Sequence, residues 1–231
     1  MLARAAAAGV ERLLVPGYDL PSSRRAVELA RSHPATIQAA VGIHPHFVGA
    51  ATHADWDELA ALTAVPEVVA VGEIGLDFFR NLSPPETQRE AFARQLALAA
   101  QVGKPVLVHD RDAHDEIRTT LLAWNGRGVL HAFSGDAAMG LAMTAAGFLV
   151  SFALPLTFSS AAGPRAAATA IPDGSFLVET DAPWLAPGGS GARNEPTTAV
   201  RVAMELARLR SIAPGEVAAQ VRGAYDRLLG G

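Results

Sequence analysis

The sequence predicts an α/β domain with a parallel sheet, on three observations. Short apolar runs rich in Val and Leu alternate with stretches long enough for a helix. The runs lack polar alternation, which is typical of strands buried on both faces. Four of them also stop at a residue that can bind a metal ion; these are VVAVGEIGLD (Glu73), PVLVHDRD (His109), GVLHAFSG (His131) and FLVETDAPW (Asp181). Together the three observations indicate a TIM-like (β/α) barrel whose strand ends carry a metal site.

The expected elements follow in order along the chain. Residues 1–10 predict a helix that ends at Gly9 and leads into the first strand. Seven strands are expected to end near Pro16, His44, Glu73, His109, His131, Phe152 and Asp181. Helices are expected over 22–32, 54–64, 84–102, 112–124, 136–146, about 160–170, about 196–210 and 214–229. The helix at 84 carries a capping signal, with Ser83 as N-cap and Glu86 closing a capping box.

A closed barrel of this type needs eight strands, so the first strand is expected to be missing. A start codon assigned too far downstream and a true truncation both explain that expectation. The Gly-rich segment 186–196 reads as a long loop at the barrel mouth, and residues 1–231 as a single domain.

Composition narrows the class of protein. Hydrophobic residues make up 50% of the chain, enough for a sizeable core. The net charge of −4 gives no overall attraction to nucleic acid, so a polyanion has to be held locally. Cysteine is absent, which excludes disulfides and thiol chemistry. With no apolar run near 18 residues, a cytoplasmic protein without membrane contact is the expectation, and a monomer is favoured.

The metal site is predicted from four residues. In a parallel barrel the carboxyl ends of the strands converge on one mouth, so Glu73, His109, His131 and Asp181 are expected to act together. Two imidazoles and two carboxylates suit one or two divalent ions, either Mg²⁺ or Mn²⁺ or Zn²⁺. Glu73 and Asp181 are the expected catalytic groups, with Asp181 able to accept a proton from water. A turn cap or an Arg partner is the alternative for Glu73, and a helix N-cap is the alternative for Asp181.

Substrate contacts are predicted from residues near the same strand ends. His44 and His46 flank a proline and are expected to donate to a phosphate. A guanidinium binds phosphate through a bidentate fork, so Arg80, Arg111 and Arg193 are expected to contact a nucleic-acid backbone. Other residues there have two open interpretations: stacking on bases or loop packing for Phe79 and Trp184, and orienting a ligand or a structural contact for Asp77 and Glu179.

The sequence resembles the TatD family of metal-dependent deoxyribonucleases, a branch of the amidohydrolase-like barrels. The matching words occur in family order: GIHPH (42–46), GEIGLDFFR (72–80), QREAFARQLALA (88–99), VHDRDAHDE (108–116), HAFSG (131–135), ETDAPWL (179–185) and RNEP (193–196). The resemblance implies a hydrolase of phosphodiester bonds in DNA, an exonuclease by likeness alone, with metal on Glu73, His109, His131 and Asp181. Many members open with His-x-His on a first strand for a second metal, and nothing of that kind precedes Arg4.

Two other functions stay open. The same ligands could serve an amidohydrolase-like enzyme acting on an amide, lactone or aminoacyl ester, because a barrel does not fix its substrate. The arginines favour phosphate over these. The second alternative is a non-catalytic barrel disabled by its missing strand, which bound metal in the purified protein would exclude.

Overall fold

The computed structural model describes residues 1–187 and 191–230. The expected loop at 186–196 therefore lies partly outside the described residues. The chain divides into two compact units. The N-terminal unit comprises Arg12–Val129, and the C-terminal unit comprises Met1–Glu11 with Leu130–Gly230. Each unit is described by itself below.

The described residues contain the seven expected strands. These are β1 (Leu13–Pro16), β2 (Ile37–Val41), β3 (Val68–Asp77), β4 (Val106–Arg111), β5 (Gly128–Leu130), β6 (Leu149–Phe152) and β7 (Phe176–Val178). The helices are α1 (Leu2–Ala7), α2 (Leu20–Ser32), α3 (His53–Thr63), α4 (Pro85–Val102), α5 (His114–Trp124), α6 (Ala137–Ala145), α7 (Ala162–Ala170), α8 (Ala199–Arg210) and α9 (Pro214–Leu229). Short 3₁₀ helices are η1 (Val48–Ala50), η2 (Leu154–Thr157) and η3 (Pro196–Thr198). The strand and helix types expected from the sequence are confirmed.

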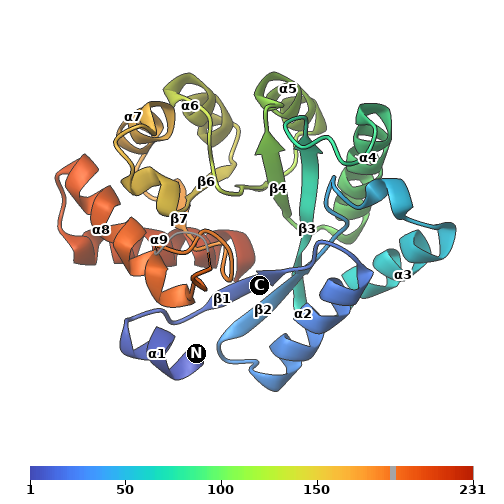
Figure 1. Ribbon diagram of the computed structural model, residues 1–231, viewed down its shortest axis with the longest axis horizontal. Helices are drawn as coiled ribbons and strands as arrows, with labels where there is room; N and C mark the ends of the chain where they lie inside the picture. The colour runs from blue at the N-terminus through green and yellow to red at the C-terminus, as the bar shows by residue number, and fades with distance from the viewer. Residues whose placement is uncertain (188–190, 231) are drawn as a thin grey trace. The chain divides into compact units, whose positions relative to one another are not determined.

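In the N-terminal unit, β1, β2, β3 and β4 pair in parallel in sequence order. Helices α2, α3 and α4 pack against these strands, as Figure 1 shows. The strand side chains are small and apolar, and Val41, Val71 and Val106 are fully buried. Burial on both faces explains the continuous apolar runs in the sequence.

Strand β3 is longer than expected. The sequence predicts its end at Glu73, but β3 continues to Asp77, which pairs with Arg111 on β4. The register between β3 and β4 shifts between Val71 and Ile74. Such an irregularity re-aims side chains relative to an even ladder. Glu73 lies within this shifted stretch, and Asp77 lies at the strand end.

Two glycines allow β3 to lie close to β4 at this point. A Cβ on Gly72 would come within 2.5 Å of the Leu107 Cβ, and a Cβ on Gly75 within 2.0 Å of the His109 carbonyl oxygen. Gly75 also has a φ of +140°, which L side chains rarely adopt. Glycine is therefore required on both sides of Glu73.

The C-terminal unit has its own core. Strands β6 and β7 pair in parallel, with Val150 opposite Phe176. Phe148, Phe152 and Phe176 are fully buried, and α9 packs on β7. At the surface of this unit, α1 is joined to the segment before η3 by the ion pair of Arg4 with Glu195, at 2.6 Å. Helix α1 is thus part of the C-terminal unit, although it comes first in the chain.

The start of α4 differs from the expectation. Its N-cap is Pro84, which has no side-chain cap. Ser83 instead accepts a hydrogen bond from the Gly49 amide through its Oγ, at 3.0 Å, and donates to the His46 carbonyl. Glu86 pairs with Arg89. The capping box was wrong because the Ser83 hydroxyl has tertiary partners in the segment that follows His44.

Among the described residues, none of the helices combines the length and apolarity needed to cross a bilayer.

Candidate metal centre

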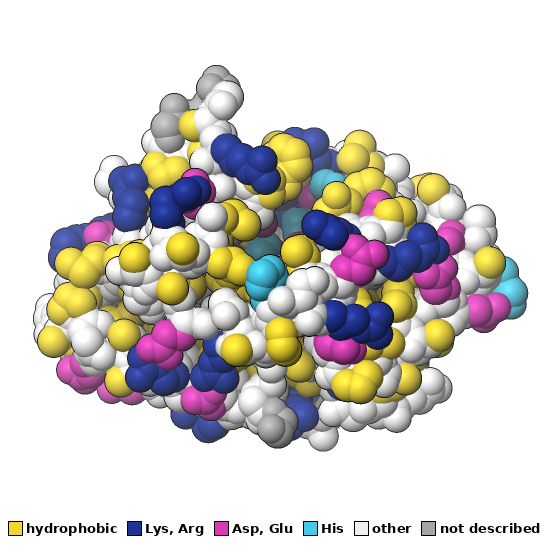
Figure 2. Space-filling view, turned by 90° about the horizontal axis from the view of Figure 1, so that it is seen from below, with side chains coloured by type: hydrophobic (Ala, Val, Ile, Leu, Met, Phe, Trp, Pro, Cys, Tyr) yellow, Lys and Arg dark blue, Asp and Glu magenta, His cyan; other side chains and the backbone are white. Residues whose placement is uncertain are grey.

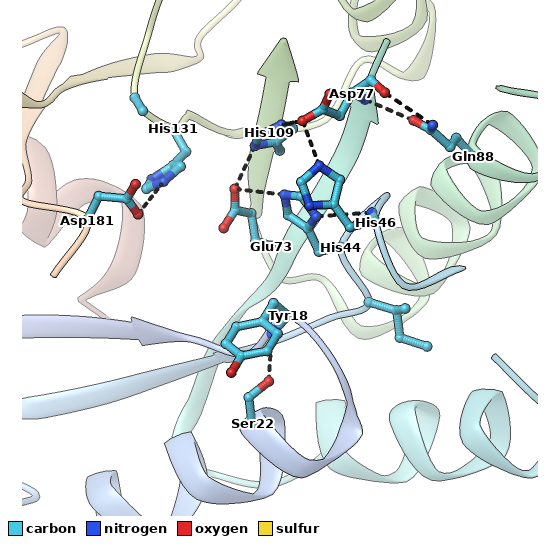
Figure 3. Close-up of polar contacts among 12 residues, drawn as sticks. Tyr18, Ser22, His44, His46, Glu73, Asp77, Gln88, His109, His131 and Asp181 are labelled. Atoms are coloured by element: carbon cyan, nitrogen blue, oxygen red, sulfur yellow. Dashed lines mark hydrogen bonds and ion pairs between the residues drawn. The ribbon is translucent and has the colours of Figure 1, made fainter. Parts of the chain in front are cut away.

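In the N-terminal unit, three histidines and two carboxylates gather at the ends of β2, β3 and β4, as Figure 3 shows. We call this group the N-terminal cluster; it consists of His44, His46, Glu73, Asp77 and His109. Glu73 and Asp77 come from β3, His109 comes from β4, and the other two histidines follow β2. Residues from three separate strands thus meet at one edge of the sheet.

The spacing of three of these groups suits a cation. Glu73 Oε1 lies 3.0 Å from His109 Nδ1 and 3.7 Å from His44 Nε2. One ligand atom from each residue lies within 4.8 Å of the others. Ligands roughly 2.0–2.2 Å from a tetrahedral zinc ion are about 3–4 Å apart, so the observed separations fit a bound metal. This set contains Glu73 and His109 as expected and adds His44.

Asp77 holds the histidines in place. Its Oδ2 makes hydrogen bonds with His109 Nε2, at 3.0 Å, and with His46 Nε2, at 2.8 Å, while Oδ1 accepts from the Arg80 amide. The carboxylate is fully buried. Burial alone pushes its pKa upward, but the bonds from His109, Arg80 and His46 outweigh that effect and hold the pKa well below its usual range. Asp77 therefore positions His109 and His46 and at the same time caps the turn at Arg80.

Gln88 on α4 fixes the backbone of Asp77. Its side-chain oxygen accepts from the Asp77 amide at 2.9 Å, and its amide nitrogen donates to the carbonyls of Asp77 and Ser83. Gln88 is fully buried, and Figure 3 shows it beside Asp77. A buried amide with all its partners supplied makes a rigid support.

His44 is almost completely buried, with 7% of its surface exposed. Burial lowers its pKa to about 3, although Glu73 acts in the opposite direction. The imidazole is therefore neutral at pH 7, the state in which histidine binds metals. Its position beside Glu73 makes it a candidate metal ligand as well as the phosphate donor that the sequence suggested.

The C-terminal unit holds a second group, His131 with Glu179 and Asp181, which we call the C-terminal cluster. His131 Nδ1 lies 2.8 Å from Glu179 Oε2, and His131 Nε2 lies 3.4 Å from Asp181 Oδ1, as Figure 3 shows for the latter pair. Glu179 also accepts hydrogen bonds from the Ser151 hydroxyl and the Ala132 amide. It thus positions His131 and leaves Nε2 facing Asp181.

The chain around Asp181 is held in an unusual conformation. Asp181 has a φ of 57°, in the left-handed region that a few per cent of non-glycine residues adopt. The adjoining segment is fixed by Asn194, which is buried, donates to the carbonyls of Thr180 and Leu185, and accepts a hydrogen bond from the Glu195 amide. Backbone outside common regions persists where surrounding structure enforces it, and such positions cluster at functional sites.

The residues expected to bind substrate have different surroundings. His46 is bonded to Asp77 in the N-terminal cluster. Arg80 and Arg111 are exposed in the same unit, and the Arg111 guanidinium lies 4.0 Å from the centre of the Phe79 ring. Arg193 is exposed in the C-terminal unit. Figure 2 shows basic and acidic side chains interspersed on the face that it presents, so any attraction for a polyanion is local.

Sequence reasoning did not weigh the supporting residues. Gln88 opens the word QREAF and Asn194 lies in RNEP, both of which were noticed as family words. Only the tertiary structure shows that their amides hold Asp77 and the Asp181 segment. A polar residue on the otherwise apolar face of a predicted helix is the sequence signal that could have identified Gln88.

An α/β fold whose strand ends gather imidazole and carboxylate ligands defines a class of protein, the metal-dependent hydrolases of TIM-like fold. Comparison with known proteins specifies the family. A family model described as TatD related DNase matches residues 1–230. The chain therefore belongs to the TatD-related DNase family, and the resemblance seen in the sequence is confirmed.

Individual relatives agree along nearly the whole chain. The uncharacterized metal-dependent hydrolase YabD of Bacillus subtilis is 36% identical over 222 residues, covering 94% of this chain and 87% of YabD. The 3'-5' ssDNA/RNA exonuclease TatD of Erwinia tasmaniensis is 36% identical over 229 residues, covering 95% and 88%. The crystal structure of YjjV, a TatD homologue from Escherichia coli, matches with a TM-score of 0.93 and 30% identity, covering 100% and 90%. The TIM-like fold is thereby confirmed.

Proposed function

We propose that this protein is a metal-dependent exonuclease that hydrolyses phosphodiester bonds in single-stranded DNA. The observation that carries the proposal is the N-terminal cluster, in which His44, Glu73 and His109 present ligand atoms within 4.8 Å of one another. Family membership supports the reaction, and the relative from Erwinia tasmaniensis, named a 3'-5' ssDNA/RNA exonuclease, supports the substrate and polarity.

The proposed ligands are Glu73 and His109 in one unit and His131 and Asp181 in the other, with His44 added. Carboxylates favour Mg²⁺ or Mn²⁺ and imidazoles favour Zn²⁺, so this mixture of residue types suits one or two ions of any of these metals. A bound divalent cation would polarise a phosphoryl oxygen and lower the pKa of a water molecule towards about 7. Asp77 and Glu179 hold His109 and His131 so that one ring nitrogen of each stays directed at Glu73 or Asp181.

Asp181 is proposed to accept the proton of the attacking water. Its side chain is 35% exposed, which gives water access, whereas the Glu73 side chain is 12% exposed. A carboxylate that touches the nucleophile needs only to take or hold one proton during attack. Glu73 is proposed to act through the metal rather than on the proton.

Phosphate contacts are proposed for His44, His46, Arg80, Arg111 and Arg193. The three arginines are exposed, and guanidinium groups bind phosphate oxygens in pairs. These contacts favour a phosphodiester over the amide or ester substrate of the alternative hydrolase. A monomer in the cytoplasm is proposed as well, on composition alone.

The test is cleavage of a single-stranded oligodeoxynucleotide carrying a label at either end. Purified protein is first analysed for bound metal, then assayed with Mg²⁺, Mn²⁺ or Zn²⁺ and with a chelator. Stepwise shortening from the 3' end that the chelator abolishes is expected. Absence of metal binding would favour the non-catalytic alternative, and faster hydrolysis of an amide or carboxylic ester than of DNA would favour the other enzyme.

A further inference from the structure

The N-terminal unit has exposed planar side chains just past the ends of its strands. Tyr18 follows β1, Phe47 follows β2 and Phe79 follows β3, with 47%, 42% and 59% of their surfaces exposed. Among the described residues of this unit, they are the only exposed aromatic residues. Single exposed hydrophobic residues are ordinary. Three at the same edge of one sheet are a pattern.

These rings adjoin one another and the N-terminal cluster. The rings of Tyr18 and Phe47 are 5.5 Å apart and tilted by 32°. The Phe47 ring lies 6.4 Å from that of His44, and the His44 amide donates to the Tyr18 carbonyl at 2.9 Å. Tyr18 and Phe47 therefore both contact His44, which in turn contacts Glu73.

A second planar pair lies on the β3 and β4 side of the same cluster. Arg111, at the end of β4, places its guanidinium 4.0 Å from the centre of the Phe79 ring. The Phe78 amide donates to the Arg111 carbonyl at 2.9 Å, which fixes the two strand ends together. Asp77, two residues before Phe79, contacts His46, whose ring lies 6.4 Å from that of Phe47. Ring contacts, the Asp77–His46 bond and the backbone from Asp77 to Phe79 thus connect Tyr18 with Arg111.

We propose that Tyr18, Phe47, Phe79 and Arg111 form a stacking platform for the unpaired bases of a single-stranded nucleic acid. An aromatic face accepts any base, because every base has a π face, and a guanidinium stacks as well as pairing with phosphate. A duplex keeps its bases stacked inside and offers no free face. The platform thus selects single strands and feeds them to the adjacent cluster, an inference that rests on the proposed nuclease function.

Binding without metal tests the platform apart from catalysis. The probe is a short single-stranded oligodeoxynucleotide containing 2-aminopurine, whose fluorescence falls when it stacks, mixed with protein in excess EDTA. The native protein is expected to quench this probe and to bind it more tightly than the same sequence as a duplex. Phe47→Leu and Phe79→Leu keep apolar bulk but lose the ring, and each is expected to weaken binding about fivefold to a hundredfold and to reduce the quenching.

Trp56→Leu is the matched control. Trp56 on α3 also carries a guanidinium over its ring, that of Arg94 at 4.6 Å, but it lies on the helical surface of the same unit. The Trp56→Leu variant is expected to bind the oligodeoxynucleotide and quench its fluorescence like the native protein. Circular dichroism checks that every variant is folded. Native-like binding and quenching by both platform variants, or equal affinity of the native protein for duplex and single strand, would overturn the platform.

The proposed function can fail separately from the platform. Native protein supplied with metal is assayed on bis(4-nitrophenyl) phosphate, which has no base to stack. Hydrolysis of this diester together with unaltered DNA binding by the platform variants refutes the platform and leaves the nuclease. Absence of hydrolysis of both the diester and DNA, with weakened binding by those variants, refutes the nuclease and leaves a single-strand binding surface.

Discussion

His109 in the N-terminal unit and His131 in the C-terminal unit are held in matching ways. His109 lies between Asp77 and Glu73, and His131 lies between Glu179 and Asp181. In each case one ring nitrogen meets a carboxylate fixed by further hydrogen bonds, and the other meets a proposed metal ligand. The ring nitrogens involved differ: Asp77 contacts Nε2 of His109, whereas Glu179 contacts Nδ1 of His131.

The two surroundings differ in their access to water. The Asp77 side chain is fully buried and Glu73 is 12% exposed, whereas Glu179 and Asp181 are 16% and 35% exposed. Charge interactions strengthen as water is excluded, so those within the N-terminal cluster are the stronger. The C-terminal cluster keeps a carboxylate within reach of solvent. The difference is the basis for the proposed division of roles, in which the first cluster mainly holds metal and Asp181 in the second exchanges protons with water.

The largest expected effect compares the two proposed catalytic carboxylates. Asp181→Asn keeps shape but removes the charge that binds metal and accepts a proton. Metal-dependent DNA cleavage should fall by about 10²-fold or more, with little change in melting temperature because Asp181 is partly exposed. Glu73→Gln should lose as much cleavage and, in addition, most of the metal bound by the N-terminal cluster.

Cleavage rates, bound metal and thermal melts measured side by side make this comparison. If Asp181→Asn cleaves DNA as fast as the parent, the cleavage comes from a contaminant. If both variants lose metal equally, the division of roles between the two carboxylates is wrong.

A smaller effect should separate the two orienting carboxylates. Loss of a group that orients a metal-bound histidine typically costs about 10–100-fold in metal affinity. The loss of metal affinity in Asp77→Asn should lie near the upper end of this range, because Asp77 is buried and contacts both His46 and His109. The loss in Glu179→Gln should lie near the lower end, because water can partly replace the contact of Glu179 with His131. Affinity is measured by competition with a fluorescent chelator.

Asp115→Asn is the control for this comparison, since the Asp115 side chain on α5 is 97% exposed and pairs with Arg118 in a surface contact. Its metal affinity should match that of the parent. A greater loss for Glu179→Gln than for Asp77→Asn would contradict the ranking that burial predicts.

The smallest expected effect is a pH dependence of stability in the N-terminal unit. Burial lowers the His44 pKa to about 3 in the folded protein, against 6.5 for an ordinary histidine. The unfolded chain therefore takes up this proton first as the pH falls. The His44 contribution is fully present above about pH 6.5 and is lost progressively as the pH falls towards about 3. Urea unfolding of the metal-free protein at about pH 7 and about pH 5 measures the loss.

The variant His44→Gln should show a smaller loss of stability over that interval. His53→Gln, which changes a histidine whose side chain is 87% exposed on α3, should keep the parent dependence. Identical slopes for His44→Gln and the parent would mean that another group titrates there.

The strands were predictable because burial on both faces leaves a continuous apolar run in the sequence. The four proposed ligands stood out because each follows or interrupts such a run, and Glu73 and His109 do lie in contact. The ends of elements were less predictable. Strand β3 continues past Glu73 because its backbone keeps pairing with β4 as far as Asp77, and α4 begins without Ser83 because that hydroxyl bonds to residues of another segment.

By itself, the sequence determined the α/β class, the seven strands, the family and the residue types available for metal binding. These depend on local properties: hydrophobic periodicity, glycine at Gly72 and Gly75, and imidazoles and carboxylates placed at strand ends. Tertiary structure alone decided that His44 joins Glu73, that Asp77 and Glu179 orient the two histidines, and that Gln88 and Asn194 support them. The physical reason is that hydrogen-bond partners and burial depend on residues distant in the chain. Those same partners set the pKa of His44 and Asp77, so the chemistry of the site is a property of the fold.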